Sequence, residues 1–350
     1  MPCGYHHITT HHIMSNSRTR SASSSSSSPP AKRQKITVAP FAASVPRRTL
    51  LSSSRWVNKV PHHIWVHQIL HPFLDLKALS TVGRCNTFFH EYWQYVLKQN
   101  VIRVPEGCPT MNEAMDLAVV FSERNECTRE NPVKIEVGEG KFVMVGVDVP
   151  DYGFFMHVSC SNMTIVGKGK GKTTINGGFY VNGKQNVKIE QLGVKNEAGH
   201  GLLCEGSGTN VDVTECCFKK GPYNGMGVKN GAIVTATRCE FMENGGHGVC
   251  CYGANTKARL NDCQMHHNEM IGLYACKDAV VDLRGTKTDI HSNRSGIRTW
   301  NHGKINIHLP SQHNTSHDNV EDDRGQLWGG SIANINADGT FTHVEEVDDY

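Results

Sequence analysis

The chain has 350 residues, which is room for two ordered domains. Its net charge of +3 hides an asymmetry: residues 1–55 contain eight Lys or Arg and no Asp or Glu, and the remainder contains 28 basic and 33 acidic residues. The slightly acidic remainder argues against a nucleic-acid partner bound through a basic surface. No apolar run is long enough for a signal peptide or a membrane span, so we expect no membrane association.

Residues 1–55 are expected to form a disordered, Ser-rich basic tail, because they hold too little apolar surface to order themselves. Within this tail, Pro30-Ala-Lys-Arg-Gln-Lys35 is similar to a single-cluster nuclear import signal. A transit peptide is the alternative interpretation, because such peptides are also rich in Ser and Arg and poor in acidic residues. The odd count of 13 cysteines without a secretion signal predicts reduced thiols in the nucleus or cytoplasm.

Residues 56–100 have a different pattern, which predicts three short helices with Asp75 placed to cap the second. The segment opens with Val60-Pro61, in the place of a Leu-Pro pair. An Ile-Leu-x-x-Leu pattern then begins at Ile69-Leu70, and an aromatic pair precedes Trp93. This segment resembles an F-box. His62-His63 stand where an acidic residue is common, and Gly83 with Cys85 disturbs the usual Val-Cys-x-x-Phe.

The resemblance implies docking on the adaptor that links F-box proteins to a cullin ubiquitin ligase. The alternative is a small helical bundle that only shields the end of the next domain. The residues that the resemblance places against the adaptor are Val60, Pro61, Ile64, Ile69, Leu70, Leu74, Leu76, Leu79 and Val82.

Residues 101–142 are expected to cap the following domain and to supply its first strand. Thr110-x-x-Glu113 fits a capping box, and Met111, Ala114, Met115, Ala118 and Phe121 follow at helical spacing. A strand is expected at Val133–Val137, followed by Gly138 to Phe142. A short helix followed by a strand and Gly-x-Gly-x-Phe resembles the N-terminal part of pectin-lyase-like β-helices.

Residues 143–340 are expected to form a solenoid, because the chain repeats about every 24 residues from Met163 to at least Ile307. The repeat shows first in apolar positions and then in glycines. The apolar ladder is Met163, Val187, Val211, Val234, Ala258, Val281 and Ile305. The glycine ladder is Gly177, Gly201, Gly225, Gly248, Gly272 and Gly296.

Period-two alternation in each unit predicts short strands with one buried face, and Gly and Asn interrupt every unit too often for helical repeats. The leucine spacing that defines leucine-rich repeats is absent, although those repeats have a similar length. The sequence therefore predicts a mainly β protein, a single-stranded right-handed parallel β-helix with one unit per coil. We expect Ser331–Ile335 to be a last strand, residues 341–350 to be an acidic tail, and five cysteines to point inward as small apolar residues: Cys204, Cys216, Cys239, Cys251 and Cys263.

An F-box followed by a parallel β-helix resembles a known class of F-box proteins with repeats of the carbohydrate-binding and sugar-hydrolase type. Those repeats recur as Phe-x-x-Asn-x-x-x-Gly, which matches Phe241 to Gly248 and, with Met for Phe, Met265 to Gly272. In that class the β-helix selects the protein to be ubiquitinated.

Catalytic chemistry is not expected. Glycoside hydrolysis needs two carboxylates about 5–9 Å apart, and the outward positions of the first strand show no adjacent pair. Gly199-His-Gly201 and Gly246-His-Gly248 are similar to the Gly-His-Gly of polygalacturonases, but its partner motifs are not placed with them, and we expect turn glycines with a solvated neighbour. No CxxC pairs, no acidic calcium cluster and no repeating metal spacing among the 20 histidines occur, so neither metal nor cofactor is expected.

The outward positions of the second strand carry residue types that are enriched in protein-binding hot spots. We expect them to form a partner-binding surface; the alternative is that a loop or the segment with Trp328 covers them. The predicted surface residues are Lys229, Tyr252, Tyr274, Arg298 and Trp300.

The sequence thus favours a substrate-recognition subunit of a cullin-RING ubiquitin ligase, with an unknown protein as its substrate. A carbohydrate-binding or polysaccharide-processing β-helix, with a glycan ligand, is the second hypothesis. A non-ubiquitin scaffold that uses the same adaptor is the third.

Overall fold

The computed structural model describes residues 99–149, 153–308, 315–336 and 338–344. The Ser-rich tail, nearly all of the F-box-like segment with its nine predicted adaptor-binding residues, and the last six residues lie outside the described residues. No helix among the described residues is long and apolar enough to cross a membrane.

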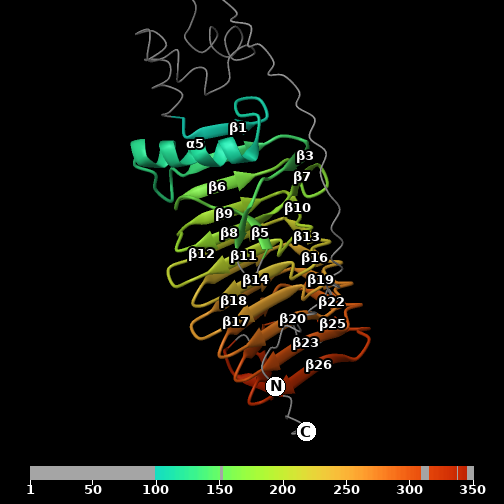
Figure 1. Cartoon of the computed structure of the whole chain (residues 1–350). Coiled ribbons are helices and arrows are strands. Elements are labelled where there is room, and N and C mark those ends of the chain that lie inside the picture. Colours follow the sequence, from blue (N-terminus) through green and yellow to red (C-terminus); the bar gives the residue numbers. More distant parts are fainter. Residues whose placement is uncertain (1–98, 150–152, 309–314, 337, 345–350) are drawn as a thin grey trace, which may run out of the picture. The chain divides into compact units, whose positions relative to one another are not determined.

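The described part is a β-solenoid whose coils each contribute strands to three sheets, stacked one above another (Figure 1). Apolar ladders at a fixed period produce this arrangement, because each coil can bury its inner face only against the next. The three sheets are called A, B and C below. The short strands of sheet B add a third strand to the two that were predicted for each coil.

Sheet A contains eleven strands in the order β1, β2, β6, β9, β12, β15, β18, β21, β24, β27, β28. Their bounds are Val101–Val104, Val133–Val137, Met163–Val166, Val187–Glu190, Asn210–Thr214, Ile233–Thr237, Lys257–Asn261, Val280–Arg284, Lys304–His308, Ser331–Ile335 and Phe341–Val344. The first ten strands pair in parallel, with the register that the apolar ladder predicts: Met163 pairs with Val187, and Val187 with Val211.

Sheets B and C contain eight and nine strands. In chain order, sheet B contains β3 (Gly140–Val143), β7 (Thr173–Asn176), β10 (Gly193–Lys195), β13 (Cys217–Lys219), β16 (Glu240–Met242), β19 (Gln264–His266), β22 (Asp289–His291) and β25 (Ser316–His317). Sheet C contains β4 (Val147–Val149), β5 (Gly153–His157), β8 (Gly178–Asn182), β11 (Leu202–Glu205), β14 (Met226–Lys229), β17 (Val249–Tyr252), β20 (Ile271–Cys276), β23 (Ser295–Trp300) and β26 (Asp322–Leu327).

Aliphatic, aromatic and thiol side chains fill the interior between the three sheets. The rings of Phe218 and Phe241 stack with centroids 5.4 Å apart, and both residues are fully buried. All five cysteines that were expected to point inward are buried as free thiols. Burial raises the pKa of Cys204 and Cys251, so these thiols act as small apolar residues.

A ladder of buried asparagines closes one corner of the coils. Asn244, Asn268 and Asn293 occupy equivalent places and are at most 3% exposed. The Oδ1 atom of Asn268 accepts from the backbone N–H and the side-chain amide of Asn244, at 3.2 and 3.0 Å. The Nδ2 atom of Asn268 donates to the carbonyl of Phe241 and to Oδ1 of Asn293, at 3.0 and 2.9 Å. This network explains the Asn of the Phe-x-x-Asn-x-x-x-Gly pattern.

The glycine ladder exists because neighbouring coils approach too closely for a side chain. A Cβ atom on Gly225 would lie 2.8 Å from the carbonyl oxygen of Gly248, and one on Gly248 would lie 2.6 Å from that of Gly272. The first member differs from the prediction. Phe179 pairs with Leu202, so Gly178 rather than Gly177 lies beside Gly201.

Helix α5 (Met111–Arg124) caps the N-terminal end of the solenoid. The Thr110 hydroxyl accepts from the Glu113 N–H at 3.2 Å, as the capping box predicts. All five residues of the predicted apolar stripe are buried. Strand β1, which precedes the helix and pairs in parallel with β2, was not predicted.

The far end of sheet A finishes differently. Strand β27 is the predicted last strand, and β28 then pairs with it in the antiparallel direction. Strand β28 lies within the segment that was assigned to the acidic tail. A reversed strand ends the regular series of parallel coils, which leaves less open edge for another chain to extend.

Candidate binding face on sheet C

The outward face of sheet C brings the predicted partner-binding residues into two neighbouring ladders. Tyr274 pairs with Arg298 in one ladder, and Lys229 pairs with Tyr252 in the other. Trp300 continues the second ladder, two strands beyond Tyr252. All five predicted residues are half-buried, as expected for positions outside the apolar interior.

Four consecutive coils each contribute one aromatic side chain to this face. We call Tyr252, Tyr274, Trp300 and Trp328 the aromatic row. The first three are half-buried, and Trp328 is 61% exposed. Trp328 directly follows strand β26, and its ring lies 5.9 Å from that of Trp300. With adjacent strands about 4.8 Å apart, Tyr252 and Trp300 are about 10 Å apart along the stack.

A lysine that sequence reasoning missed orients the first ring of the row. Lys277 follows strand β20 in the left-handed region, at φ 51°, which turns its side chain back onto the sheet. Its ammonium donates to the Tyr252 hydroxyl at 2.6 Å and lies 4.7 Å from the ring centroid. The recurring left-handed turn after each sheet C strand could have indicated this residue.

The two predicted cationic residues are engaged inside the protein. Arg298 Nη2 lies 2.6 Å from Asp322 Oδ2, and Lys229 Nζ lies 3.3 Å from Glu205 Oε1, where the lysine side chain is only 11% exposed. Although burial opposes the shift, the Tyr180 hydroxyl and the Lys229 ammonium hold the pKa of Glu205 below its usual value. Two of the cations beside the aromatic rings, Arg298 and Lys229, are therefore paired with carboxylates, whereas Lys277 contacts the Tyr252 hydroxyl.

The histidines of both Gly-His-Gly motifs have structural roles. His200 is 3% exposed, and its Nδ1 accepts from the Asn224 N–H at 3.1 Å. His247 Nδ1 accepts from the Ile271 N–H at 3.2 Å. Burial, helped by Lys229, lowers the pKa of His200 to about 4, and burial lowers that of His247 to about 4. The expected solvated neighbour is thus wrong for His200, because the backbone of the next coil encloses its ring.

His247 also supports the aromatic row from the side. Its ring lies 5.0 Å from that of Tyr274, at a tilt of 31°. A neutral imidazole is required here, since a protonated Nδ1 could not accept from the backbone. The turn before β17 thus supplies the side chain that packs against Tyr274.

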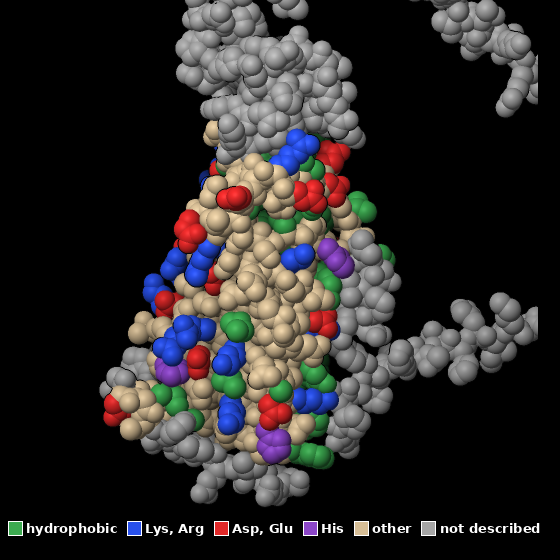
Figure 2. Space-filling view, turned by 90° about the vertical axis from the view of Figure 1, so that its left-hand side faces the viewer, with side chains coloured by type: hydrophobic (Ala, Val, Ile, Leu, Met, Phe, Trp, Pro, Cys, Tyr) green, Lys and Arg blue, Asp and Glu red, His purple; other side chains and the backbone are tan. Residues whose placement is uncertain are grey.

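Sheet A presents a solvated polar face. Its outward register partners include Lys188 with Asp212 and Arg259 with Asp282, and no two described register partners in this sheet are both carboxylates. Figure 2 shows Lys and Arg side chains interspersed with Asp and Glu along one flank of the view, with mostly other side chains and backbone between. Such mixed charge is typical of an ordinary protein surface.

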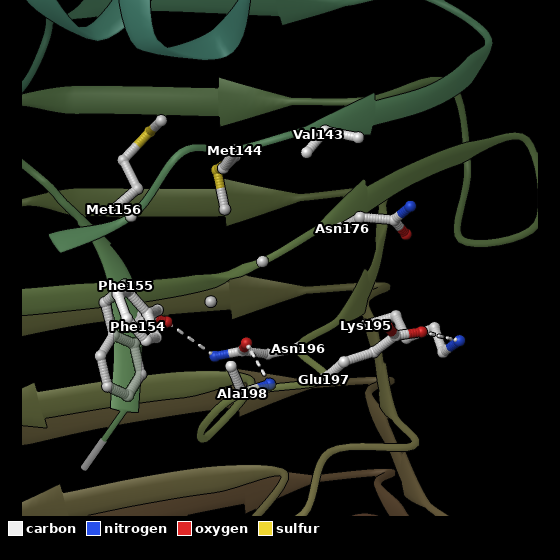
Figure 3. Close-up of a pocket in the computed structure, with 13 residues that line it drawn as sticks. Val143, Met144, Phe154, Phe155, Met156, Asn176, Lys195, Asn196, Glu197 and Ala198 are labelled. Carbon is white, nitrogen blue, oxygen red and sulfur yellow. Dashed lines mark hydrogen bonds and ion pairs between the residues drawn. The ribbon is translucent and has the colours of Figure 1, made fainter. Parts of the chain in front are cut away.

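A pocket of about 340 Å³ lies near the N-terminal end, where sheets B and C meet (Figure 3). Phe154 and Phe155 lie on one side, and Lys195 pairs with Glu197 on the other. Asn196 donates to the carbonyls of Phe154 and His200, at 3.0 and 2.7 Å. These polar groups bond to one another or to the backbone, so they hold strand β5 in place.

Comparison with known proteins agrees with the fold. Residues 157–316 match the family model described as a right-handed beta helix region. The A-module of mannuronan C-5 epimerase AlgE4 of Azotobacter vinelandii is 12% identical, with a TM-score of 0.37, and the alignment covers 66% of this chain and 79% of that one. The AlgE6 A-module of the same organism is also 12% identical, with a TM-score of 0.30 over 66% and 78% of the two chains.

ORF18 of Geobacillus virus E2 is 10% identical, with a TM-score of 0.32, and covers 71% of this chain and 64% of the viral one. No curated protein matches the sequence. Likenesses at these identities and TM-scores carry no conclusion for this chain, and the family-model match alone concerns its fold. Residues 157–316 are thus a right-handed β-helix region, with coils of about 24 residues.

Proposed function

We propose that the β-helix is a carbohydrate-binding scaffold that holds a linear glycan along the aromatic row of sheet C. One observation carries the proposal: four consecutive coils each place one aromatic side chain on the same outward face. A linear ligand suits this surface, because each of the four coils can offer one aromatic ring to it. Aromatic rings offer an apolar face and a polar edge, which suits the faces and hydroxyls of sugar rings.

The ion pairs of Arg298 and Lys229 favour an uncharged glycan over an acidic one. Arg298 and Lys229 are bound to Asp322 and Glu205, so they are not available as partners for uronate carboxylates. Breaking a half-buried ion pair to bind a ligand would leave a carboxylate without its partner. We therefore expect neutral hexose polymers to bind better than polyuronates such as mannuronan.

The test is a binding titration of the full chain with soluble neutral glucans and mannans, and with mannuronan and polygalacturonate as acidic probes. The variant Trp300→Ala/Trp328→Ala should lose at least tenfold in affinity for the neutral glycan that binds best. Arg259→Ala, on exposed sheet A, is the matched control and should bind like the wild type. Equal binding by both variants, or no binding to any glycan, would contradict the proposal.

A ubiquitin-ligase receptor is the second candidate, and the F-box-like residue pattern from Val60 to Trp93 favours it. In this candidate the helical segment docks the ligase adaptor, and the sheet C face holds a target protein near the conjugating enzyme, which raises the local concentration of its lysines. Adaptor binding without any change in the lifetime of the bound partner would favour the non-ubiquitin scaffold instead.

A pull-down of the full chain with the purified ligase adaptor tests this second candidate. Pro61→Ala/Leu70→Asp should abolish capture, because it changes two residues that the F-box resemblance places against the adaptor. Absence of capture by the wild-type chain would reject the ligase receptor. Glycan binding in the absence of the adaptor would support the carbohydrate scaffold.

A further inference from the structure

Three histidines form a ladder on the outward face of sheet B, away from the aromatic row. His266 pairs in register with His291, and His291 with His317. The rings of His266 and His291 stack with centroids 5.1 Å apart and planes 2° apart. The rings of His291 and His317 stack at 5.6 Å. These residues recur at the coil period, a regularity that the sequence analysis did not detect.

A fourth histidine turns back against the first member of this ladder. His267 follows strand β19 in the left-handed region, at φ 56°. Its exposed ring stands almost perpendicular to that of His266, at 84°, and the two Nδ1 atoms lie 2.8 Å apart. The equivalent left-handed positions of the next two coils hold Ser292 and Asp318, so only this coil has two imidazoles at that corner among the three.

A carboxylate fixes which nitrogen of His266 is free to accept. Glu240 Oε1 lies 3.1 Å from Nε2 of His266, and its other oxygen lies 2.8 Å from the Lys170 ammonium. With Lys170 on its other oxygen, Glu240 is placed to accept the Nε2–H of His266. In the tautomer that donates Nε2–H to Glu240, the Nδ1 atom of His266 carries a lone pair and lies 2.8 Å from Nδ1 of His267.

A carboxylate that orients the far nitrogen of a histidine is the arrangement found behind metal-ligating imidazoles. We infer that the Nδ1 atoms of His266 and His267 chelate one divalent transition-metal ion of tetragonal preference, Cu²⁺ or Ni²⁺, with Glu240 as the positioning residue. In the metal-free protein one proton lies between the two Nδ1 atoms. When the ion takes its place, His267 changes tautomer: its Nδ1 proton is lost to solvent and Nε2 takes one up, so both imidazoles stay neutral and no net proton is released.

The distance between the nitrogens selects the type of metal. With metal–nitrogen bonds of about 2.1 Å, two nitrogens 2.8 Å apart subtend an angle of about 84° at the ion. That angle is close to the right angle of square-planar and octahedral ions, and far from the tetrahedral angle of Zn²⁺. A small rotation of the exposed His267 ring brings both lone pairs onto the ion.

The other coordination positions belong to solvent or to a bound molecule. Among the described residues, no three His, Cys, Asp or Glu side chains are grouped as a metal site. The nearest further imidazole, His291, has its Nδ1 within 3.0 Å of the Ser292 hydroxyl. The chelate is therefore bidentate, with an exposed side open to a second ligand.

The experiment counts bound ions by calorimetric titration with Cu²⁺ and Ni²⁺ alone. Other adjacent histidine pairs, His6-His7, His11-His12 and His62-His63, would also bind ions, so they are changed to Gln in every sample. On this background His266→Gln/His267→Gln should lose one equivalent of Cu²⁺, and His317→Gln, the control from the same ladder, should lose none. Glu240→Gln should retain the equivalent with about tenfold to a hundredfold weaker binding.

A residue-resolved measurement keeps the inference testable if a variant folds poorly. Copper-catalysed oxidation with ascorbate, read by peptide mass spectrometry, should modify His266 and His267 in the unsubstituted chain before His291 or His317. An unchanged copper stoichiometry in a folded His266→Gln/His267→Gln variant would overturn the inference. So would oxidation spread evenly over the ladder, or Zn²⁺ binding tighter than Cu²⁺ binding at this pair.

Discussion

The buried asparagine ladder gives the most direct quantitative prediction, through Asn268→Ala. The substitution removes two hydrogen bonds that the Asn268 side chain accepts and two that it donates. At about 1 kcal/mol for each net bond, the free energy of unfolding should fall by about 4 kcal/mol. The Asn244 N–H is left buried without its acceptor, so we expect the loss in the free energy of unfolding to be at least this large.

Asn261→Ala in the same coil is the matched control. Its side chain is half-buried and makes one hydrogen bond, to the Thr237 hydroxyl at 3.2 Å, so the loss should stay below about 1 kcal/mol. Urea unfolding of the full chain, followed by far-ultraviolet circular dichroism, measures both variants. Two equal losses would refute the reasoning, because the ladder would then contribute no more than an ordinary surface amide.

Three further predictions follow from the packing and the charges. Gly225→Ala should destabilise strongly, because its Cβ would lie 2.8 Å from a backbone oxygen, whereas Gly171→Ala, with nothing within 4 Å, should be neutral in the same urea assay. His200 has a folded-state pKa of about 4 against 6.5 unfolded, so protonation favours the unfolded chain, and stability should fall by about 3 kcal/mol between pH 6.5 and pH 4. His200→Gln should remove that part of the pH dependence; an unchanged slope in urea titrations across this range would contradict the assignment. Lys277→Met should weaken glycan binding several-fold by freeing the Tyr252 ring, without the loss of fold that circular dichroism would detect.

The sequence was sufficient to predict the coils because their signal is periodic. Val187, Val211 and Val234 stand at the coil interval, and a buried ladder can be formed from such positions only by stacking. The outward parity of Tyr274 and Trp300 followed from the same register. The helix before the coils was predictable because Thr110 and the stripe from Met111 to Phe121 combine a cap with helical spacing.

The remaining features depend on contacts between coils that one segment does not reveal. The burial of His200 is imposed by the backbone at Asn224, one coil away. Arg298 pairs with Asp322 across a coil that is longer than those between Met163 and Ile305, because Ile305 pairs with Ile332, 27 positions on. Strand β1 was missed because four residues carry too little pattern.

Because the register of the coils is fixed, the length of the stack is set by the number of coils. Removing one complete unit, from Val211 up to Val234, would rejoin equivalent positions of the ladder and shorten the stack by about 4.8 Å. A feature confined to the sheet B strand and the turn of one retained coil would be unchanged by such a deletion. A surface assembled from several coils would become shorter by one unit. Coil number thus offers a way to adjust the length of an extended binding surface without redesigning any single contact.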